Sequence, residues 1–277
     1  SAGEVQKIYN AGLFGVNAAG AQAFTPPVST LPVTNGLQLW LDSTDPSTLT
    51  TNGQLVSEWR DKSGLNNHAG QSDSAKQPSL TSGGINGLPV IDFNRDQLTI
   101  PGGVNIGQGD ERTVFIVFDY SALTNNSELF GKNGGNMIDV GSFFQSERLR
   151  LRAADTGGPG DDGFNGLYSG NGTLPVGAHI LTVVGADAGT LALSDGLPII
   201  ADPGDFFHYA LDNNLGIGGA NFAGREFIGA LAEVIVFDRV LSELEGQQVG
   251  AYLERKYGLD TAFVAPIPEP TSVGLLV

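Results

Sequence analysis

Thr113-Val114-Phe115-Ile116-Val117-Phe118 is the stretch of this 277-residue chain that decides its fold. Nearly all of its residues are apolar. A strand with one face in water alternates apolar and polar residues, so an unbroken apolar run predicts a central strand that is buried on both faces.

Other strands are predicted on both sides of this run. Leucines alternate with other residues along 37–41, which is the period of two typical of a strand. The runs 180–184 and 190–193 flank the turn residues 187–189 as the two arms of a hairpin. Residues 232–237 form another strongly apolar segment.

One helix is predicted among these strands, over residues 243–256. Ser242 and Glu245 have the spacing of a capping box, in which each side chain bonds a backbone N–H of the first helical turn. Gly258 suits the left-handed conformation that ends many helices. Many short strands with one late helix favour an all-β, two-sheet sandwich.

The domain organisation follows from composition. Residues 1–12 carry a second capping pattern and predict a short N-terminal helix, which could end a preceding module. Residues 13–35 are rich in Ala, Gly, Pro and Thr and read as a linker. We place the β-sandwich at 36–259 and a Pro-rich tail at 260–277.

Charge and cysteine content exclude several classes of function. The chain has 14 Lys+Arg against 30 Asp+Glu, a formal net charge of -16. Such a surface repels nucleic acid, because phosphate binding needs clustered Lys and Arg. The chain contains no cysteine, which excludes disulfides and thiolate metal sites.

The turn-rich strand motifs resemble a known family. They stand in the order Gly36-Leu37-Gln38-Leu39-Trp40-Leu41-Asp42, Trp59 to Ala69, Gly84 to Phe93 and Gly229 to Arg239. In this order they are similar to LamG-like domains, which are concanavalin A-like jelly rolls. The resemblance spans about residues 36–259 and implies that fold; over 120–225 it consists of strand periodicity alone.

Calcium is the metal that the residues favour. The resemblance implies one Ca²⁺ near a sheet edge, for which Asp42, Asp45 and Asp61 offer oxygen ligands. Separately, residues 157–162 match one copy of the Gly-Gly-x-Gly-x-Asp calcium repeat and contain Asp161 and Asp162. The alternative for that segment is a solvated acidic loop.

Catalysis is not expected. Related glycosidases on this fold need two carboxylates on one face of a strand. Glu233 and Asp238 are five residues apart and point to opposite faces of a regular strand. An interior Glu233 would instead need a partner or a metal. The sequence has neither a Gly-x-Ser-x-Gly nucleophile elbow nor a phosphate-binding loop.

Glycan binding is predicted for one aromatic cluster, which starts at Phe206. Aromatic rings could cover a sugar while carboxylates and amides bond its hydroxyls. The candidate residues are Phe207, His208, Tyr209, Asp212 and Asn213. The alternative is an apolar loop packed on the sandwich. Trp40 and Trp59 are expected in the core.

A sorting signal is predicted at Pro268-Glu269-Pro270, which runs into the aliphatic residues 273–277. The motif resembles the start of the PEP-CTERM signal. That resemblance implies an exosortase-type processing enzyme as a partner. It also implies export to the cell surface or extracellular matrix of a Gram-negative-type bacterium. The five apolar residues are far fewer than the roughly 20 that span a bilayer.

These observations together predict a non-catalytic, exported structural or adhesive module. We expect it to form a homo-oligomer or filament through its terminal segments. The alternative is a calcium-dependent carbohydrate-binding module with a polysaccharide as its partner.

Overall fold

The computed structural model of the protein describes residues 30–107, 109–120, 127–132, 136–140, 147–152, 166–202, 210–219 and 226–263. Its contacts divide the chain into two units, residues 1–30 and 31–277. Leu31 and Val33, in the segment expected to be a linker, are buried in the second unit. The helix expected over 1–12 and the sorting motif lie outside the described residues.

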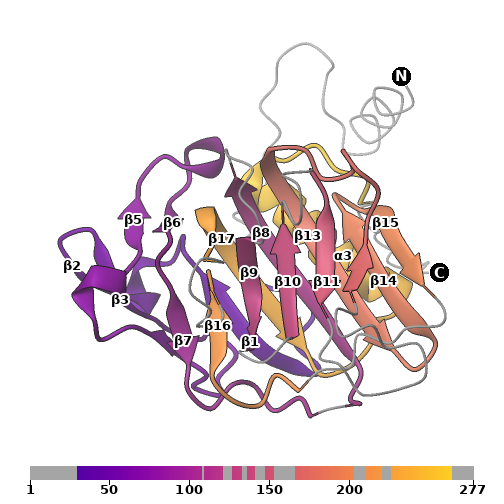
Figure 1. The fold of residues 1–277 in the computed structure, drawn as a ribbon, viewed down its shortest axis with the longest axis horizontal. Coiled ribbons are helices and arrows are strands. Elements are labelled where there is room, and N and C mark those ends of the chain that lie inside the picture. Colours follow the sequence, from indigo (N-terminus) through magenta and orange to yellow (C-terminus); the bar gives the residue numbers. More distant parts are fainter. Residues whose placement is uncertain are drawn as a thin grey trace, which may run out of the picture. The chain divides into compact units, whose positions relative to one another are not determined.

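A back sheet forms around the apolar run. Its strands are antiparallel and follow the order β5, β6, β17, β8, β13, β14 and β15. β1 pairs with the same edge of β17 as β6 does, further along that strand. β8 is the centre of this sheet (Figure 1), so the predicted central strand is confirmed. In chain order the strands are β1 (Leu37–Asp42), β5 (Ser79–Thr81), β6 (Val90–Asn94), β8 (Arg112–Tyr120), β13 (Gly177–Ala186), β14 (Gly189–Ser194), β15 (Leu197–Asp202) and β17 (Ile228–Phe237).

A front sheet follows the antiparallel order β3, β4, β7, β16, β9, β10, β11 and β12. β3 also pairs with β5 of the back sheet and, in a hairpin, with β2. The strands are β2 (Leu49–Asn52), β3 (Leu55–Trp59), β4 (Ala69–Gly70), β7 (Leu98–Ile100), β9 (Ser127–Lys132), β10 (Asn136–Val140), β11 (Leu149–Arg152), β12 (Gly166–Tyr168) and β16 (Leu215–Ile217).

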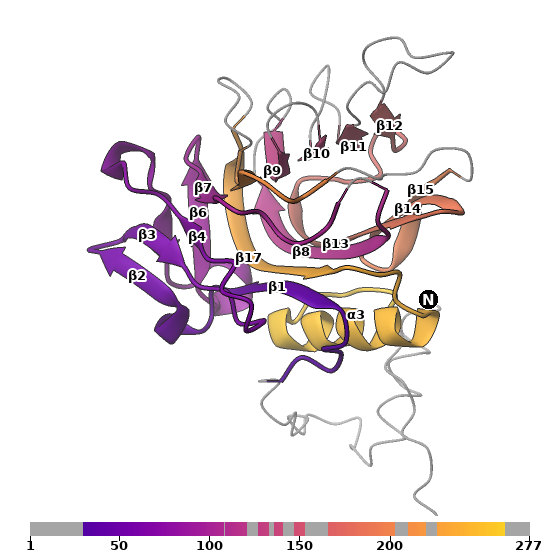
Figure 2. The same ribbon diagram turned by 90° about the horizontal axis from the view of Figure 1, so that it is seen from below.

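The hydrophobic core fills the space between the two sheets, which Figure 2 shows as separate layers. Alternate residues of β8, such as Ile116 and Phe118, meet Ile138 and Leu151 of the front sheet in this core. Side chains between these positions point to the outer face of each sheet. The chain therefore has the all-β sandwich that its sequence predicts.

Helix α3 (Glu243–Tyr257) covers the outer face of the back sheet, opposite the front sheet (Figure 2). Ser242 and Glu245 form the predicted capping box, and Gly258 ends the helix in the left-handed conformation. Phe115 of β8 packs edge-on against Phe237 of β17 on this side, so β8 is buried on both faces. None of the described helices is long and apolar enough to cross a bilayer.

A buried histidine makes stability depend on pH. Both ring nitrogens of His179 face acceptors, Asp195 Oδ2 at 2.6 Å and the Pro175 carbonyl oxygen at 2.7 Å. Only the imidazolium form can donate to both. Burial alone would lower the pKa of His179, but Asp195 more than offsets this, and the net pKa is raised above 6.5.

The pair should therefore stabilise the fold fully below about pH 6.5 and lose its effect as pH rises through the raised pKa. We expect Asp195→Asn to lower the melting temperature at about pH 5.5 and to change it much less at about pH 9. Thermal unfolding of both proteins across that range measures this. A deficit that stays constant with pH would contradict it.

Candidate functional site

A groove crosses the outer face of the front sheet at β3, β4 and β7. Glu58, Gly70 and Thr99 are neighbours in register on these strands. Thr99 points outward, because Leu98 and Ile100 on either side of it are in the core. Gly70 lies between Glu58 and Thr99 and has no side chain, so the floor of the groove is open between those two residues.

The groove has a volume of about 560 Å³. Seven of its nine lining residues carry a polar group on the side chain; the nine are Ser57, Glu58, His68, Gly70, Gln71, Ser72, Gln77, Thr99 and Pro101. None of these described lining residues is Phe, Tyr or Trp. The groove thus offers hydrogen bonds to the edges of a ligand and, among its described lining residues, no Phe, Tyr or Trp ring to stack on it.

The hydrogen bond to His68 fixes its tautomer. Its Nδ1 accepts the backbone N–H of Asp61 at 3.0 Å. The ring proton of the neutral imidazole then sits on Nε2, which is left as a donor. The backbone N–H of Asp61 therefore determines that His68 presents a hydrogen-bond donor to the groove.

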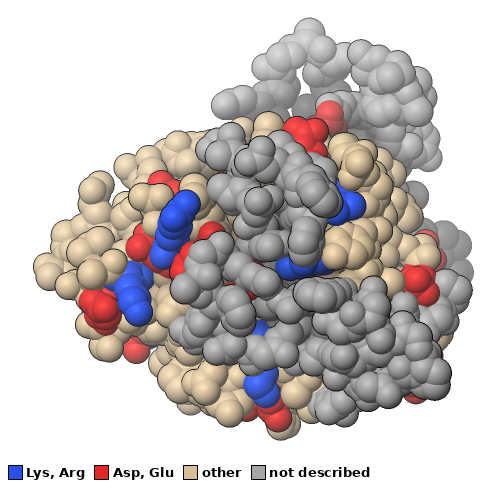
Figure 3. Space-filling view, viewed as in Figure 1, with Lys and Arg blue, Asp and Glu red and all other residues tan. Residues whose placement is uncertain are grey.

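Glu58 supplies an anionic acceptor. Its Oε2 accepts bonds from Arg60 Nε at 2.9 Å and from Thr50 Oγ1 at 3.1 Å, while Oε1 has no hydrogen-bond partner among the described residues. Burial raises the pKa of Glu58, but Arg60 and Thr50 outweigh it, and the net pKa is lowered. Figure 3 shows acidic and basic side chains together over β2 and β3.

Glycines continue the same row across the sheet. Thr99 lies opposite Gly216 of β16, which lies opposite Gly131 of β9. Glycine inside a strand is unfavourable and often marks a close approach by a ligand or another segment. The row runs from Glu58 through three glycines and one threonine, so the face carries few side chains along this line.

A second polar row lies on β9 to β12, beside the glycine row. Glu128, Asp139, Arg150 and Tyr168 are neighbours in register. Glu128 and Arg150 are buried, although it is the residues next to them on their strands that point into the core. The guanidinium of Arg148 lies 4.6 Å from the centre of the Tyr168 ring.

Neither the groove nor this row was predicted from the sequence. A signal for the second row was present: Arg148-Leu149-Arg150-Leu151-Arg152 alternates basic and apolar residues with the period of a strand. The groove had no such signal, because its residues meet only through the register of three separate strands.

Lysine ammonium groups contact two of the three predicted calcium ligands of the domain. Lys62 Nζ lies 2.9 Å from Asp42 and 3.1 Å from Asp45, and Lys256 Nζ lies 2.7 Å from Asp42. Burial raises the pKa of Asp42, but the two lysines and Thr44 outweigh it, so the net pKa is lowered.

The third predicted ligand, Asp61, organises a turn. It accepts backbone N–H bonds from Trp40 at 2.9 Å, Ser63 at 2.8 Å and Asn67 at 3.0 Å. Among the described residues no group of three His, Cys, Asp or Glu side chains is placed to hold a metal. Asp161 and Asp162 lie outside these residues, and calcium binding stays a prediction.

Glu233 has the partners that its position demands. It is 1 % exposed on the helix side of β17. It accepts bonds from Trp40 Nε1 at 2.7 Å, Tyr252 Oη at 3.0 Å and Tyr257 Oη at 2.8 Å, and it pairs with Lys256 at 2.7 Å. Burial and the nearby carboxylates raise the pKa of both tyrosines, which remain donors. Glu233 is thus enclosed as a structural group.

The predicted glycan cluster is described only in part. Phe207, His208 and Tyr209 lie outside the described residues. Asp212 and Asn213 are exposed in the loop before β16, and Asp212 pairs with Lys132 at 2.7 Å. Trp59 is fully buried, as expected, whereas Trp40 is half-buried under Lys62.

Comparison with known proteins shows a shared fold. Neither a protein-family model nor a curated protein matches the sequence. Trypanosoma rangeli sialidase is similar in structure at a TM-score of 0.52 and 14% identity, over 94% of this chain and 38% of that one. The binding domain of Paraclostridial Mosquitocidal Protein 1 is similar at a TM-score of 0.55 and 11% identity, over 79% and 52%.

The chain shares their β-sandwich. It spans less than two fifths of the sialidase and about half of the binding-domain structure. At these identities the likeness concerns the fold alone.

Proposed function

We propose that this protein is a non-catalytic carbohydrate-binding module whose front sheet holds a hydroxyl-rich ligand over Gly70. The observation that carries the proposal is the groove, where unused hydrogen-bonding groups of both kinds converge. His68 Nε2 donates, and Glu58 Oε1 accepts. A sugar hydroxyl both donates and accepts, so it satisfies both groups.

The dimensions support a short ligand. Glu58 and Thr99 lie two strands apart, which is roughly 10 Å. One or two sugar rings fit this span, and a volume of about 560 Å³ is within the range of small-ligand sites. The LamG-like resemblance and the structural likeness to a binding domain support a binding role.

Gly70→Val should weaken binding strongly without unfolding the protein. A Cβ at Gly70 meets only the Ser57 carbonyl oxygen, at an ordinary 3.6 Å, so valine fits its strand and fills the groove. We expect at least a tenfold loss of affinity, which is about 1.4 kcal/mol. A glycan array identifies the ligand, and calorimetry with that ligand compares the two proteins.

Thr51→Val is the matched control, because Thr51 is exposed on β2 and does not line the groove. It should bind like the wild type. Equal binding by Gly70→Val would move the site elsewhere on the protein. Running each titration with Ca²⁺ and with a chelator decides whether binding depends on calcium.

Adhesion at the cell surface is the setting we propose for this binding. It rests on the PEP-CTERM-like motif and the acidic composition. Assembly through the termini stays a prediction, because residues 1–29 and 264–277 lie outside the described part of the chain. Negative-stain microscopy of the 277-residue chain and of a chain without 264–277 tests it, since only the first should form filaments.

A further inference from the structure

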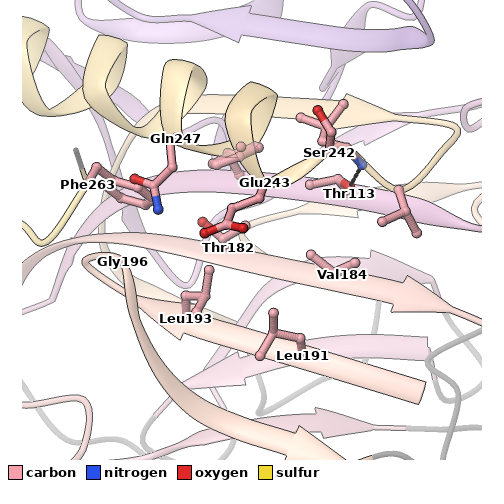
Figure 4. Close-up of a pocket in the computed structure, with 14 residues that line it drawn as sticks. Thr113, Thr182, Val184, Leu191, Leu193, Gly196, Ser242, Glu243, Gln247 and Phe263 are labelled. Atoms are coloured by element: carbon pink, nitrogen blue, oxygen red, sulfur yellow. Dashed lines mark hydrogen bonds between the residues drawn. The ribbon is translucent and has the colours of Figure 1, made fainter. Parts of the chain in front are cut away.

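A cavity separates the first turns of α3 from the back sheet. Its volume is about 390 Å³. Strands β8, β13 and β14 form one wall, and α3 with the segment that precedes it forms the other (Figure 4). The groove described above lies on the front sheet, so the two sites are separate.

Most of the wall is apolar. The apolar side chains that line it are Phe115, Val184, Leu191, Leu193, Val240, Leu241 and Phe263. Phe263 closes one end of the cavity, with its ring against Gly250 of α3. Exposed residues at the start of the helix, Ser242 and Glu243, mark the other end.

One polar atom in the wall lacks a partner. The Thr182 hydroxyl is buried and has no hydrogen bond among the described residues, and the residue is 3 % exposed. A buried hydroxyl without a partner is destabilising. In Figure 4 Thr182 lies on the sheet directly across from Glu243 of α3.

A glycine in the helix keeps the space open. Gly246 lines the cavity, and a Cβ built on it meets nothing within 4 Å. Glycine inside a helix is about 1 kcal/mol less favourable than alanine. At this position, which lines the cavity, the helix therefore has the residue type with the lowest helix propensity after proline.

We propose that this cavity binds an uncharged, largely apolar small molecule that offers one hydrogen-bond donor, such as an aryl or alkyl alcohol. The apolar wall holds the body of the molecule. The donor pairs with Thr182 Oγ1, with Glu243 nearby as a second acceptor. An apolar cavity of about 150 Å³ holds benzene, so this one, at about 390 Å³, takes a molecule of roughly 10 to 18 non-hydrogen atoms.

The charges in the wall decide against an anion. Glu243 is the one charged side chain among the described lining residues, and neither Lys nor Arg is present there. A fatty acid would bring a second carboxylate next to Glu243, and the two like charges would repel each other. An alcohol of the same length brings only a hydroxyl.

Binding of the uncharged fluorescent amine N-phenyl-1-naphthylamine to the full chain tests the proposal. We expect one saturable site. Gly246→Leu should lower the affinity at least tenfold, and Thr182→Val, which replaces the hydroxyl by a methyl group, about fivefold. Arg255→Leu, exposed on the same helix outside the cavity, should bind like the wild type.

Competition separates the two ligand classes. 1-Decanol should displace the probe at a concentration at least tenfold lower than decanoate does. Absence of a saturable site, unchanged affinity of Thr182→Val, or equal displacement by decanoate would each overturn the proposal. Should Gly246→Leu fail to fold by circular dichroism, Thr182→Val and the competition still decide. Loss of glycan binding in Gly70→Val leaves these outcomes unaffected.

Discussion

Replacing Lys256 by methionine should lower the free energy of unfolding by about 3 to 5 kcal/mol, the usual result of removing one partner from a buried ion pair. Lys256 Nζ lies 2.7 Å from Glu233 and 2.7 Å from Asp42. The Glu233 side chain is 0 % exposed and that of Asp42 is 5 % exposed. Without the ammonium group, Glu233 is a buried carboxylate with only neutral donors.

Asp42 is less affected, because Lys62 still pairs with it at 2.9 Å. Glu233 should therefore dominate the loss, and neutralising it should restore part of the stability. We expect Lys256→Met with Glu233→Gln to be more stable than Lys256→Met alone, a coupling typical of contacting residues.

Urea unfolding followed by far-ultraviolet circular dichroism measures these differences. Arg255→Met is the matched control, because Arg255 is an exposed cation next to Lys256 on the same helix. It should change stability by less than about 0.5 kcal/mol. A loss in Lys256→Met that is no larger than this would mean that water reaches the pair.

Gly103→Ala should lower the free energy of unfolding by roughly 3 kcal/mol. Gly103 has a φ of +64, where a Cβ is strained, and this term contributes about 1 to 2 kcal/mol. A Cβ there would also lie 2.1 Å from the Leu211 carbonyl oxygen and 2.4 Å from the Asn213 nitrogen. Those atoms belong to backbone, which cannot rotate away.

Gly53→Ala isolates the effect of the close approach. Gly53 has nearly the same φ, +62, but a Cβ on it meets nothing within 4 Å. Gly53→Ala should therefore lower the free energy of unfolding by only about 1 to 2 kcal/mol, which comes from the strained φ. The loop that carries Asp212 and Asn213 packs on Gly103, so Gly103→Ala should also raise the sensitivity of that loop to proteases. Equal losses in the two variants would show that the loop moves aside easily.

The sequence predicted the parts of the fold whose signals are local. Period and apolarity identified β1, β8, β17 and the hairpin of β13 and β14, and capping residues placed α3 to within one residue. It also predicted that an interior Glu233 needs a partner. The partner itself, Lys256, lies 23 positions away on a helix, and a helix face cannot be matched to a strand from spacing alone.

The candidate site was less predictable for a physical reason. Glu58, Gly70 and Thr99 become neighbours through the register of β3, β4 and β7, which hydrogen bonds set only once the sheet forms. Similarly, Asp42 and Asp45 have the chemistry of calcium ligands, and only the folded chain brings Lys62 to both of them.

The two tryptophans occupy different layers of the protein. Trp59 is enclosed between the sheets, whereas Trp40 lies at the surface that α3 covers, with Lys62 4.2 Å above its ring and Glu233 on its indole nitrogen. Their emission spectra therefore report two separate events, the melting of the sandwich and the release of the helix. Single-tryptophan variants would show whether the helix detaches before the sheets separate.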